Sequence, residues 1–309
     1  MDVSIVVPVY NECRNLSALY DRLRRVMETQ RISYEMIFVD DGSSDGSLEI
    51  LKSFAATDSH VAVVEFMRNF GQHAAVMAGL ERSTGEIVVT LDADLQNPPE
   101  EIPKLLQKME EGYDSVGGHR QRREDFFLRK MASFFLNKWS AALFGLELKD
   151  YGCMLRAYRR AVVDQIVKCQ EASTYIPALA NSFAKRVTEI PVEHAARAEG
   201  TSHYSLLKLL RLNFDLMTGF SLLPIQLVGL AGVLVALCGL VFGLFLFARR
   251  LFVGPEVEGV FTLFAILFVF IGLQLLALGI VGEYVGRIYR EVRRRPRSVV
   301  RKIYTQEKK

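Results

Sequence analysis

Four short apolar segments rich in β-branched residues alternate with amphipathic segments over the first hundred positions. The apolar segments cover residues 3–9, 34–40, 61–67 and 87–92, and they predict strands. Between them, apolar positions at helical spacing predict helices over Leu16–Gln30, Ser47–Ala56 and Ala74–Ser83. Strands that alternate with helices favour an α/β fold, a parallel sheet with helices on both faces. Such sheets bind ligands at the carboxyl ends of their strands, so the residues that follow each strand are candidates for chemistry.

Two long segments near the C-terminus contain no charged residue, at positions 216–248 and 259–282. Each exceeds the roughly 20 residues that a helix needs to cross a bilayer core. We therefore predict transmembrane helices over 224–248 and 259–282, which form a hairpin through the short segment 249–258. The alternative, two buried core helices, is disfavoured because buried helices rarely remain uncharged over such lengths.

Two further segments are amphipathic. In residues 126–144 the apolar positions have helical spacing, and a helix at a membrane interface and an ordinary core helix explain the pattern equally well. In residues 206–223 the only charges, Lys208, Arg211 and Asp215, share one stripe, and the segment leads directly into the first predicted span. This pattern favours an interfacial helix. The chain thus divides into a catalytic domain (1–204), a juxtamembrane helix (205–223), the two spans and a basic tail (283–309).

The charge distribution agrees with a membrane anchor. The whole chain has a net charge of +3, but the part from Arg287 onward holds ten Lys or Arg and only two Glu, so the preceding part is net acidic. Basic residues beside a span indicate the cytoplasmic side, and the absence of an N-terminal signal pattern places the catalytic domain there too. Both termini are therefore expected in the cytoplasm, although Arg249 and Arg250 between the spans run against this rule. A nucleic-acid-binding tail is the weaker explanation.

The four cysteines, Cys13, Cys153, Cys169 and Cys238, have no paired spacing. They indicate neither a disulfide framework nor a zinc site, and we expect reduced thiols.

Acidic and amide side chains follow three of the predicted strands. The segments are Pro8-Val9-Tyr10-Asn11-Glu12, Asp40-Asp41-Gly42-Ser43-Ser44-Asp45-Gly46 and Asp92-Ala93-Asp94-Leu95-Gln96. Carboxylates at strand ends can accept hydrogen bonds from a nucleobase or a ribose. Two carboxylates at i and i+2 can also converge on Mg²⁺ or Mn²⁺, which prefer oxygen ligands and would neutralise a diphosphate leaving group. The alternative is solvated or helix-capping carboxylates, and Asp45, which precedes a glycine, is a candidate for a cap or turn.

Together these motifs resemble the donor-binding half of glycosyltransferase family 2, which has a GT-A (Rossmann-like) fold. The similarity continues through RNFGQHAAVMAG (68–79), DYGCMLRAYRR (150–160), ARAEGTSHYS (196–205) and GEYVGRIY (282–289). Because it extends through both predicted spans, it is closest to the polyprenyl-phosphate glycosyltransferases. Within them it looks most like the bacterial branch that transfers 4-deoxy-4-formamido-L-arabinose for lipid A modification and polymyxin resistance. Glucosyl and mannosyl relatives share most of the motifs.

The resemblance implies roles for individual residues, a UDP-sugar donor, an undecaprenyl phosphate acceptor, a divalent metal and a homo-oligomer such as a tetramer. The implied nucleotide-sugar site consists of Pro8, Tyr10, Glu12, Asp40, Asp92, Ala93 and Arg120. The implied metal ligands are Asp92, Asp94 and Gln96, and the implied acceptor residues are Arg129, Arg197 and Ser202. Asp92, Asp94 and Asp150 are the expected catalytic residues.

Several of these residues have structural alternatives. Arg120 could belong to a solvated charge run, and Arg129 could extend from an amphipathic helix to lipid headgroups. Tyr10 could lie in the core, and Asp150 could cap a following helix.

Three other functions are less consistent with the sequence. A polysaccharide synthase would resemble its relatives in a Gln-x-x-Arg-Trp motif, but Asn137 and Lys138 precede Trp139, the only tryptophan. A dehydrogenase would show G-x-G-x-x-G after the first strand, where none occurs. A non-catalytic scaffold or a component of a lipid-carrier flippase remains the alternative from another class, and the intact Asp92-Ala93-Asp94 argues against it. The sequence therefore predicts inverting sugar transfer to a polyprenyl phosphate at the cytoplasmic face of a bacterial inner membrane.

Overall fold

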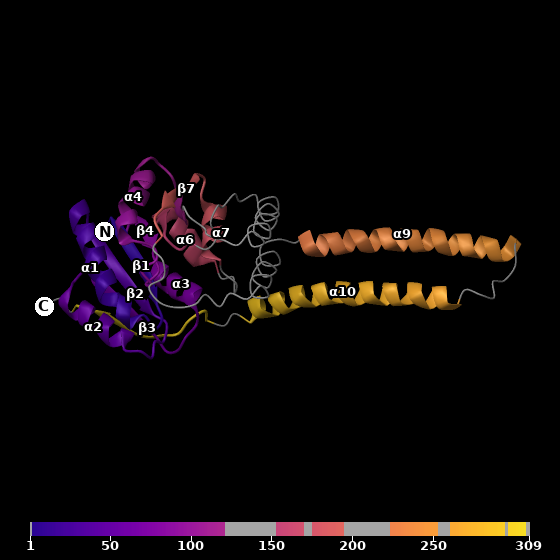
Figure 1. The fold of residues 1–309 in the computed structure, drawn as a ribbon, viewed down its shortest axis with the longest axis horizontal. Helices are drawn as coiled ribbons and strands as arrows, with labels where there is room; N and C mark the ends of the chain where they lie inside the picture. Colours follow the sequence, from indigo (N-terminus) through magenta and orange to yellow (C-terminus); the bar gives the residue numbers. More distant parts are fainter. Residues whose placement is uncertain are drawn as a thin grey trace. The chain divides into compact units, whose positions relative to one another are not determined.

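The computed structural model describes residues 2–120, 153–169, 175–194, 223–252, 260–293 and 296–306 (Figure 1). They form two units, an α/β unit and a helical unit made of α9 (Leu223–Phe252) and α10 (Val260–Val292). Residues 296–306 belong to the α/β unit although they follow α10 in the chain.

The α/β unit is built on an eight-stranded sheet with the order β7-β5-β6-β4-β1-β2-β3-β8. The strands are β1 (Val3–Val9), β2 (Tyr34–Asp40), β3 (Val61–Phe66), β4 (Ile87–Thr90), β5 (Ser115–Arg120), β6 (Arg156–Arg159), β7 (Val187–Val192) and β8 (Val300–Thr305). The four predicted strands are parallel neighbours in the centre, as expected. The sheet as a whole is mixed, because β6 and β8 pair antiparallel with β4 and β3.

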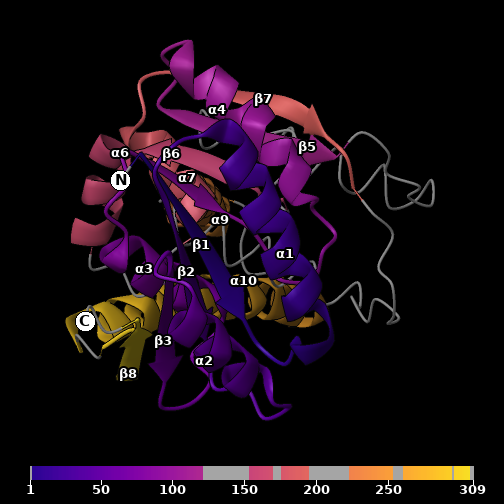
Figure 2. The ribbon, with the colours of Figure 1, turned by 90° about the vertical axis from the view of Figure 1, so that its left-hand side faces the viewer.

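Helices cover both faces of this sheet, as the alternating pattern predicts. They are α1 (Cys13–Gln30), α2 (Ser47–Thr57), α3 (Gln72–Arg82), the short 3₁₀ helix η1 (Pro99–Glu101), α4 (Ile102–Glu110), α6 (Arg160–Lys168) and α7 (Ile176–Phe183). Figure 2 shows α1 and α2 on one side of β1 and β2, and α3 and α6 on the other.

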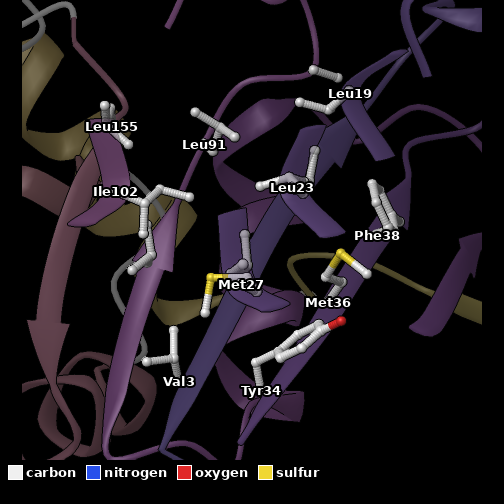
Figure 3. Packing of buried hydrophobic residues seen from close by; sticks show 14 of the residues in the cluster. Val3, Leu19, Leu23, Met27, Tyr34, Met36, Phe38, Leu91, Ile102 and Leu155 are labelled. Carbon is white, nitrogen blue, oxygen red and sulfur yellow. The ribbon is translucent and has the colours of Figure 1, made fainter. Parts of the chain in front are cut away.

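The main hydrophobic core lies between the sheet and α1, α2 and α4. Alternate residues of β1, from Val3 to Val9, join this core. In Figure 3, Leu23 and Met27 of α1 pack near Met36 and Phe38 of β2, all four fully buried. On the opposite face α3 packs so tightly that a Cβ at Gly79 would come within 2.2 Å of the Val6 side chain. A strand buried on both faces explains why β1 is a continuous apolar run.

The strand β8 was not predicted from the sequence, which indicates only a basic tail there. It pairs with β3, and its Arg301 and Tyr304 donate hydrogen bonds to the buried Glu65 at 3.1 and 2.7 Å. Burial opposes ionisation of Glu65, but the bonds from Tyr304 and Arg301 outweigh it and lower the pKa of this carboxyl. β8 contains two adjacent basic residues, Arg301 and Lys302, and shows no clear apolar alternation, so the sequence pattern does not reveal a strand there.

Two helices are long and apolar enough to cross a membrane by length and composition. The candidate spans are Ile225–Phe245 in α9 and Ile266–Gly286 in α10, with mean hydropathies of 2.6 and 2.2, and none of either window is buried. Both predicted spans therefore lie in helices, and α10 continues about ten residues beyond the predicted end. The candidate interfacial helix 126–144 lies outside the described residues, and so does the candidate 206–223 except for Leu223, which begins α9.

Candidate active site

The carboxyl ends of β1, β2, β4 and β5 lie on one edge of the sheet. The first three strands are parallel neighbours. Because β6 runs antiparallel to both β4 and β5, β5 has the same direction as β4. This edge therefore gathers the segments after Val9, Asp40 and Thr90, together with Arg120, the last residue of β5. The side chain of Arg120 is not among the described ones.

Hydrogen bonds join the segments that follow β1 and β2. The backbone of Asn11 is in the left-handed region (φ 55°), which asparagine tolerates better than most residues. Its N–H donates to Ser43 Oγ at 3.1 Å, and its Oδ1 accepts from the Ser44 N–H at 2.8 Å. Beside it, Tyr10 is 50% exposed, so the alternative of a core tyrosine is wrong. Its ring is available to a ligand at the edge.

Asp45 caps two helices. Its carboxylate accepts hydrogen bonds from the Cys13 N–H at the start of α1 (2.9 Å) and from the Ser47 N–H at the start of α2 (3.0 Å). Burial opposes ionisation of Asp45, yet the hydrogen bonds from Ser47 and Cys13 prevail and lower its pKa to about 2. The interpretation of Asp45 as a residue that caps a helix or shapes a turn is confirmed, because its carboxylate accepts the first backbone N–H group of both helices.

The carboxylates of Asp40 and Asp41 are almost fully buried, with 1% and 2% of each residue exposed. Asp40 Oδ2 accepts from the Ser43 N–H at 3.3 Å, while Oδ1 is buried without a hydrogen-bond partner. Burial raises the pKa of Asp40, and the bonds from Ser43 only partly oppose it. A buried acceptor of this kind at a strand end is suited to an N–H donor of a ligand.

Asp41, in contrast, accepts hydrogen bonds from the protein backbone. Its two oxygens accept the backbone N–H groups of Phe70 and Gly71 at 2.6 and 2.8 Å, just before α3. Burial raises the pKa of Asp41, with these two bonds acting in the opposite direction. The loop also packs against Gly42, where a Cβ would come within 2.7 Å of the Arg68 backbone. Asp41 and Gly42 thus fix the segment that leads into α3.

The segment after β4 forms a tight turn that carries the Asp-x-Asp motif. Leu95 is in the left-handed region (φ 60°), and the Gln96 N–H donates to Asp94 Oδ1 at 3.1 Å. Asp92 and Asp94 are half-buried, whereas Ala93 between them is buried. The side-chain amide of Gln72, the first residue of α3, donates to Asp92 Oδ1 at 2.5 Å.

The chain approaches this turn a second time at the start of β6. Thr90 Oγ1 donates to the Met154 carbonyl at 2.7 Å, and the Cys153 thiol lies 3.7 Å from Asn97 Oδ1. The DYGC motif therefore ends beside the Asp-x-Asp turn. Asp150, three residues before Cys153, lies outside the described part of the chain.

Most of the candidate donor and metal residues thus share one edge. These are Pro8, Tyr10, Glu12, Asp40, Asp92, Ala93, Asp94 and Gln96, with the backbone of Arg120. The candidate acceptor residues Arg129, Arg197 and Ser202 fall outside the described residues. The sequence predicted no role for Asp41 or Gln72, although Gln72 lies in the motif RNFGQHAAVMAG (68–79).

Asp92, Asp94 and Gln96 offer oxygen atoms that could serve as ligands of a divalent cation. Across the described ranges no three His, Cys, Asp or Glu side chains gather closely enough to enclose a metal. Mg²⁺ at phosphate sites commonly uses only one or two carboxylates and takes its other ligands from water and substrate phosphates. Two carboxylates and an amide on an open turn fit that kind of site.

Comparisons with known proteins agree with this geometry. The family model described as "Glycosyl transferase family 2" matches residues 4–167. An undecaprenyl-phosphate 4-deoxy-4-formamido-L-arabinose transferase of Yersinia pestis (strain Pestoides F) is 51% identical over 304 residues, which cover 97% of this chain and 93% of that protein. The protein of the same name from Yersinia pseudotuberculosis serotype O:3 (strain YPIII) matches equally well.

A solved structure shows the same fold. It is glucosyl-3-phosphoglycerate synthase from Mycobacterium tuberculosis in complex with Mn²⁺, UDP and glucosyl-3-phosphoglycerate. It superposes with a TM-score of 0.51 at 19% identity, over 71% of this chain and 78% of that one. The similarity supports the GT-A-like arrangement of the sheet.

Proposed function

Since this chain belongs to glycosyltransferase family 2, we propose that it transfers 4-deoxy-4-formamido-L-arabinose from a UDP-sugar to undecaprenyl phosphate. The observation that carries the proposal is the extent of the 51% identity, which includes both the sheet and the two apolar helices. A soluble sugar acceptor would not require the helices. The carboxylates at the carboxyl ends of the strands would bind the UDP-sugar donor.

The nucleotide would lie at the ends of β1 and β2. Asp40 Oδ1, a buried acceptor without a partner, suits an N–H group of the uracil base. The exposed ring of Tyr10 offers a surface on which the base can stack. Pro8 and Glu12 flank Tyr10 on the same segment and complete the proposed nucleotide site.

Asp92, Asp94 and Gln96 would hold a divalent cation, Mg²⁺ or Mn²⁺, at the diphosphate. Bound there, the cation would neutralise the charge that develops on the leaving nucleoside diphosphate. The half-buried position of both carboxylates supports this role, because a ligand can approach them without displacing the core. Arg120, at the end of β5, would add positive charge at the same edge.

The reaction follows from the acceptor's chemistry. An oxygen of the acceptor phosphate attacks the anomeric carbon, the bond from that carbon to the diphosphate breaks, and UDP leaves with the electron pair. A phosphate is already ionised at neutral pH, so a strong general base is less necessary than in transfer to a hydroxyl. Arg129, Arg197 and Ser202 would bind the acceptor phosphate, and Asp150 would orient it. A single displacement inverts the anomeric configuration.

The acceptor's tail requires a membrane. The two apolar helices would anchor the protein in a bacterial inner membrane. The catalytic unit and both termini would lie on the cytoplasmic face, and residues 206–223 would form an interfacial helix. The first pair of β8 joins Val300 to Phe66 at the carboxyl end of β3. β8 therefore begins at the edge of the sheet that carries the proposed site. Assembly as a homo-oligomer, such as a tetramer, is part of the proposal.

The test is product identification. Purified full-length protein is offered a panel of UDP-sugars with undecaprenyl phosphate in lipid vesicles, and the lipid product is identified by mass spectrometry. We expect the formamido-arabinosyl lipid, no product with excess chelator, and little with Asp94→Asn. A glucosyl or mannosyl lipid would reject the proposed sugar, and full activity in chelator would reject the metal.

The acceptor site has its own test. We expect Arg197→Ala to raise the apparent KM for lipid phosphate by at least about tenfold, since charge-assisted hydrogen bonds to phosphate contribute ~1.5–3 kcal/mol. The KM for the UDP-sugar should change little. An equal rise in both values would place Arg197 elsewhere.

A further inference from the structure

A side chain outside the candidate set contacts the Asp-x-Asp motif. Gln72 is the first residue of α3, and its Nε2 donates to Asp92 Oδ1 at 2.5 Å. The two residues are 20 positions apart and come from segments that follow different strands. The contact therefore exists only because the sheet brings those strand ends together.

The position of Gln72 is set by the segment before it. Asp41 accepts the N–H groups of Phe70 and Gly71 through both oxygens, and Gly71 turns the chain with φ 99° into α3. Gly42 allows the backbone of Arg68 and Asn69 to approach closely. Gln72 thus extends from a segment that the buried end of β2 holds in place, which limits where its amide can lie.

The chemistry of the donor matters as much as its position. A side-chain amide is a neutral donor, so it can fix the orientation of a carboxylate without neutralising it. A lysine or arginine in its place would form an ion pair and compete with a cation. Metal-binding carboxylates are in turn hydrogen-bonded by neighbouring groups that orient them, and a side-chain amide can serve as such a group.

We infer that Gln72 is a positioning residue for the donor site, whose amide orients Asp92 toward a divalent cation at the nucleotide diphosphate. The inference rests on the proposed metal-assisted function. A series of contacts connects the acidic ends of β2 and β4. Asp41 holds the backbone of Phe70 and Gly71, and the next residue, Gln72, donates to Asp92. The residue acts on the cation through Asp92 and is not expected to contact it.

Two variants test this inference in the full-length protein. Gln72→Met keeps the length of the side chain and removes the amide, and Gln72→Asn keeps the amide but shortens its reach by one methylene. The matched control is Gln107→Met, which removes the same group from the exposed surface of α4. UDP affinity is measured by calorimetry with saturating Mn²⁺ and again with chelator, and thermal unfolding is followed for each protein.

Loss of a residue that orients a metal ligand typically costs about 10- to 100-fold in metal affinity or activity. We expect both Gln72 variants to lose UDP affinity by about that factor in Mn²⁺, to match wild type in chelator, and to unfold at the wild-type temperature. Gln107→Met should behave as wild type throughout.

The outcomes separate this inference from the proposed function. If wild-type UDP affinity does not depend on Mn²⁺, the proposed metal site fails. If it does and both Gln72 variants retain the full Mn²⁺ effect, the positioning role of Gln72 is overturned. Equal losses with and without Mn²⁺ would also overturn it, because they indicate a general structural role.

Discussion

The ends of β2 and β4 carry similar acidic motifs, but the fold uses them differently. At the end of β2, Asp41 is buried and both of its oxygens accept backbone N–H groups. At the end of β4, Asp92 and Asp94 are half-buried; Asp92 accepts a hydrogen bond from the Gln72 side chain and Asp94 accepts one from the Gln96 backbone. A carboxylate saturated by the protein's own amides stabilises the fold, whereas one on an open turn can bind a ligand. The same residue type therefore lies in two different environments at one edge of the sheet.

The largest expected effect is on turnover at the β4 end. Asp92→Asn preserves the shape of the side chain and the carbonyl oxygen that can accept from Gln72, but it removes the negative charge. Groups that stabilise developing charge in a transition state typically contribute about 10²- to 10³-fold in kcat, and we expect a loss of that size. The measurement is the initial rate of lipid glycosylation, with thermal unfolding of the same sample as the control. A variant that retains most of its turnover would remove Asp92 from the catalytic set.

The next effect concerns stability at the β2 end. Asp41→Ala leaves the N–H groups of Phe70 and Gly71 without their acceptor, which costs about 1–3 kcal/mol when such groups are buried. We expect a clear decrease in the unfolding temperature and in the midpoint of urea unfolding. Asp94→Asn, on the more open turn, should leave both close to wild type, within roughly 0.5 kcal/mol. If the two variants are equally stable, the contrast between the two strand ends is wrong.

The smallest effect concerns how the contributions of Asp45 and Asp41 to folding stability change with pH. The folded pKa of Asp45, about 2, lies below its usual value of 3.8, so its contribution to stability is present above pH ~4 and is lost as the pH falls toward 2. The pKa of Asp41 is raised, so folding binds its proton more tightly and stability decreases as the pH rises past 3.8.

Urea unfolding at several pH values between about 2 and 5 measures how the free energy of unfolding changes with pH, both below and above pH 4. Asp45→Asn should remove the part of the stability that increases from pH 2 to 4 and leave the slope above pH 4 unchanged. An unaltered slope below pH 4 would show that the caps of α1 and α2 do not depend on this charge.

Much of the donor half could be predicted from the sequence, because its signals are local. The runs before Val9 and Asp40 predict strands from composition alone, and parallel strands place their carboxyl ends on one edge whatever else the chain does. The bond from Asp45 to the start of α2 was also foreseeable, since Ser47 lies two positions away, whereas its bond to Cys13, 32 positions away, was not. The apolar helices required only a count of uncharged positions.

The remaining features depend on contacts between distant segments. Which carboxylate is almost fully buried, as Asp41 is, and which is half-buried, as Asp92 is, cannot be inferred from two acidic motifs of similar composition. It depends on the loop before α3, whose Phe70 reaches Asp41 across 29 positions, and on the start of α3, whose Gln72 reaches Asp92 across 20. Likewise β8 lies 236 positions from Glu65, its ion-pair partner, and a short charged segment carries no pattern that reveals such a partner.

The sequence by itself therefore determined the elements, the acidic edge and the family, because propensity, periodicity and motif spacing are properties of neighbouring residues. Only the tertiary structure decided which carboxylates bind the protein's own backbone N–H groups and that Gln72 contacts Asp92. It also decided that the C-terminal segment forms β8, which pairs with β3 at the end of the sheet. The physical reason is that burial and hydrogen-bond saturation depend on which backbone amides approach a side chain in space. Packing of the sheet against its helices sets that approach.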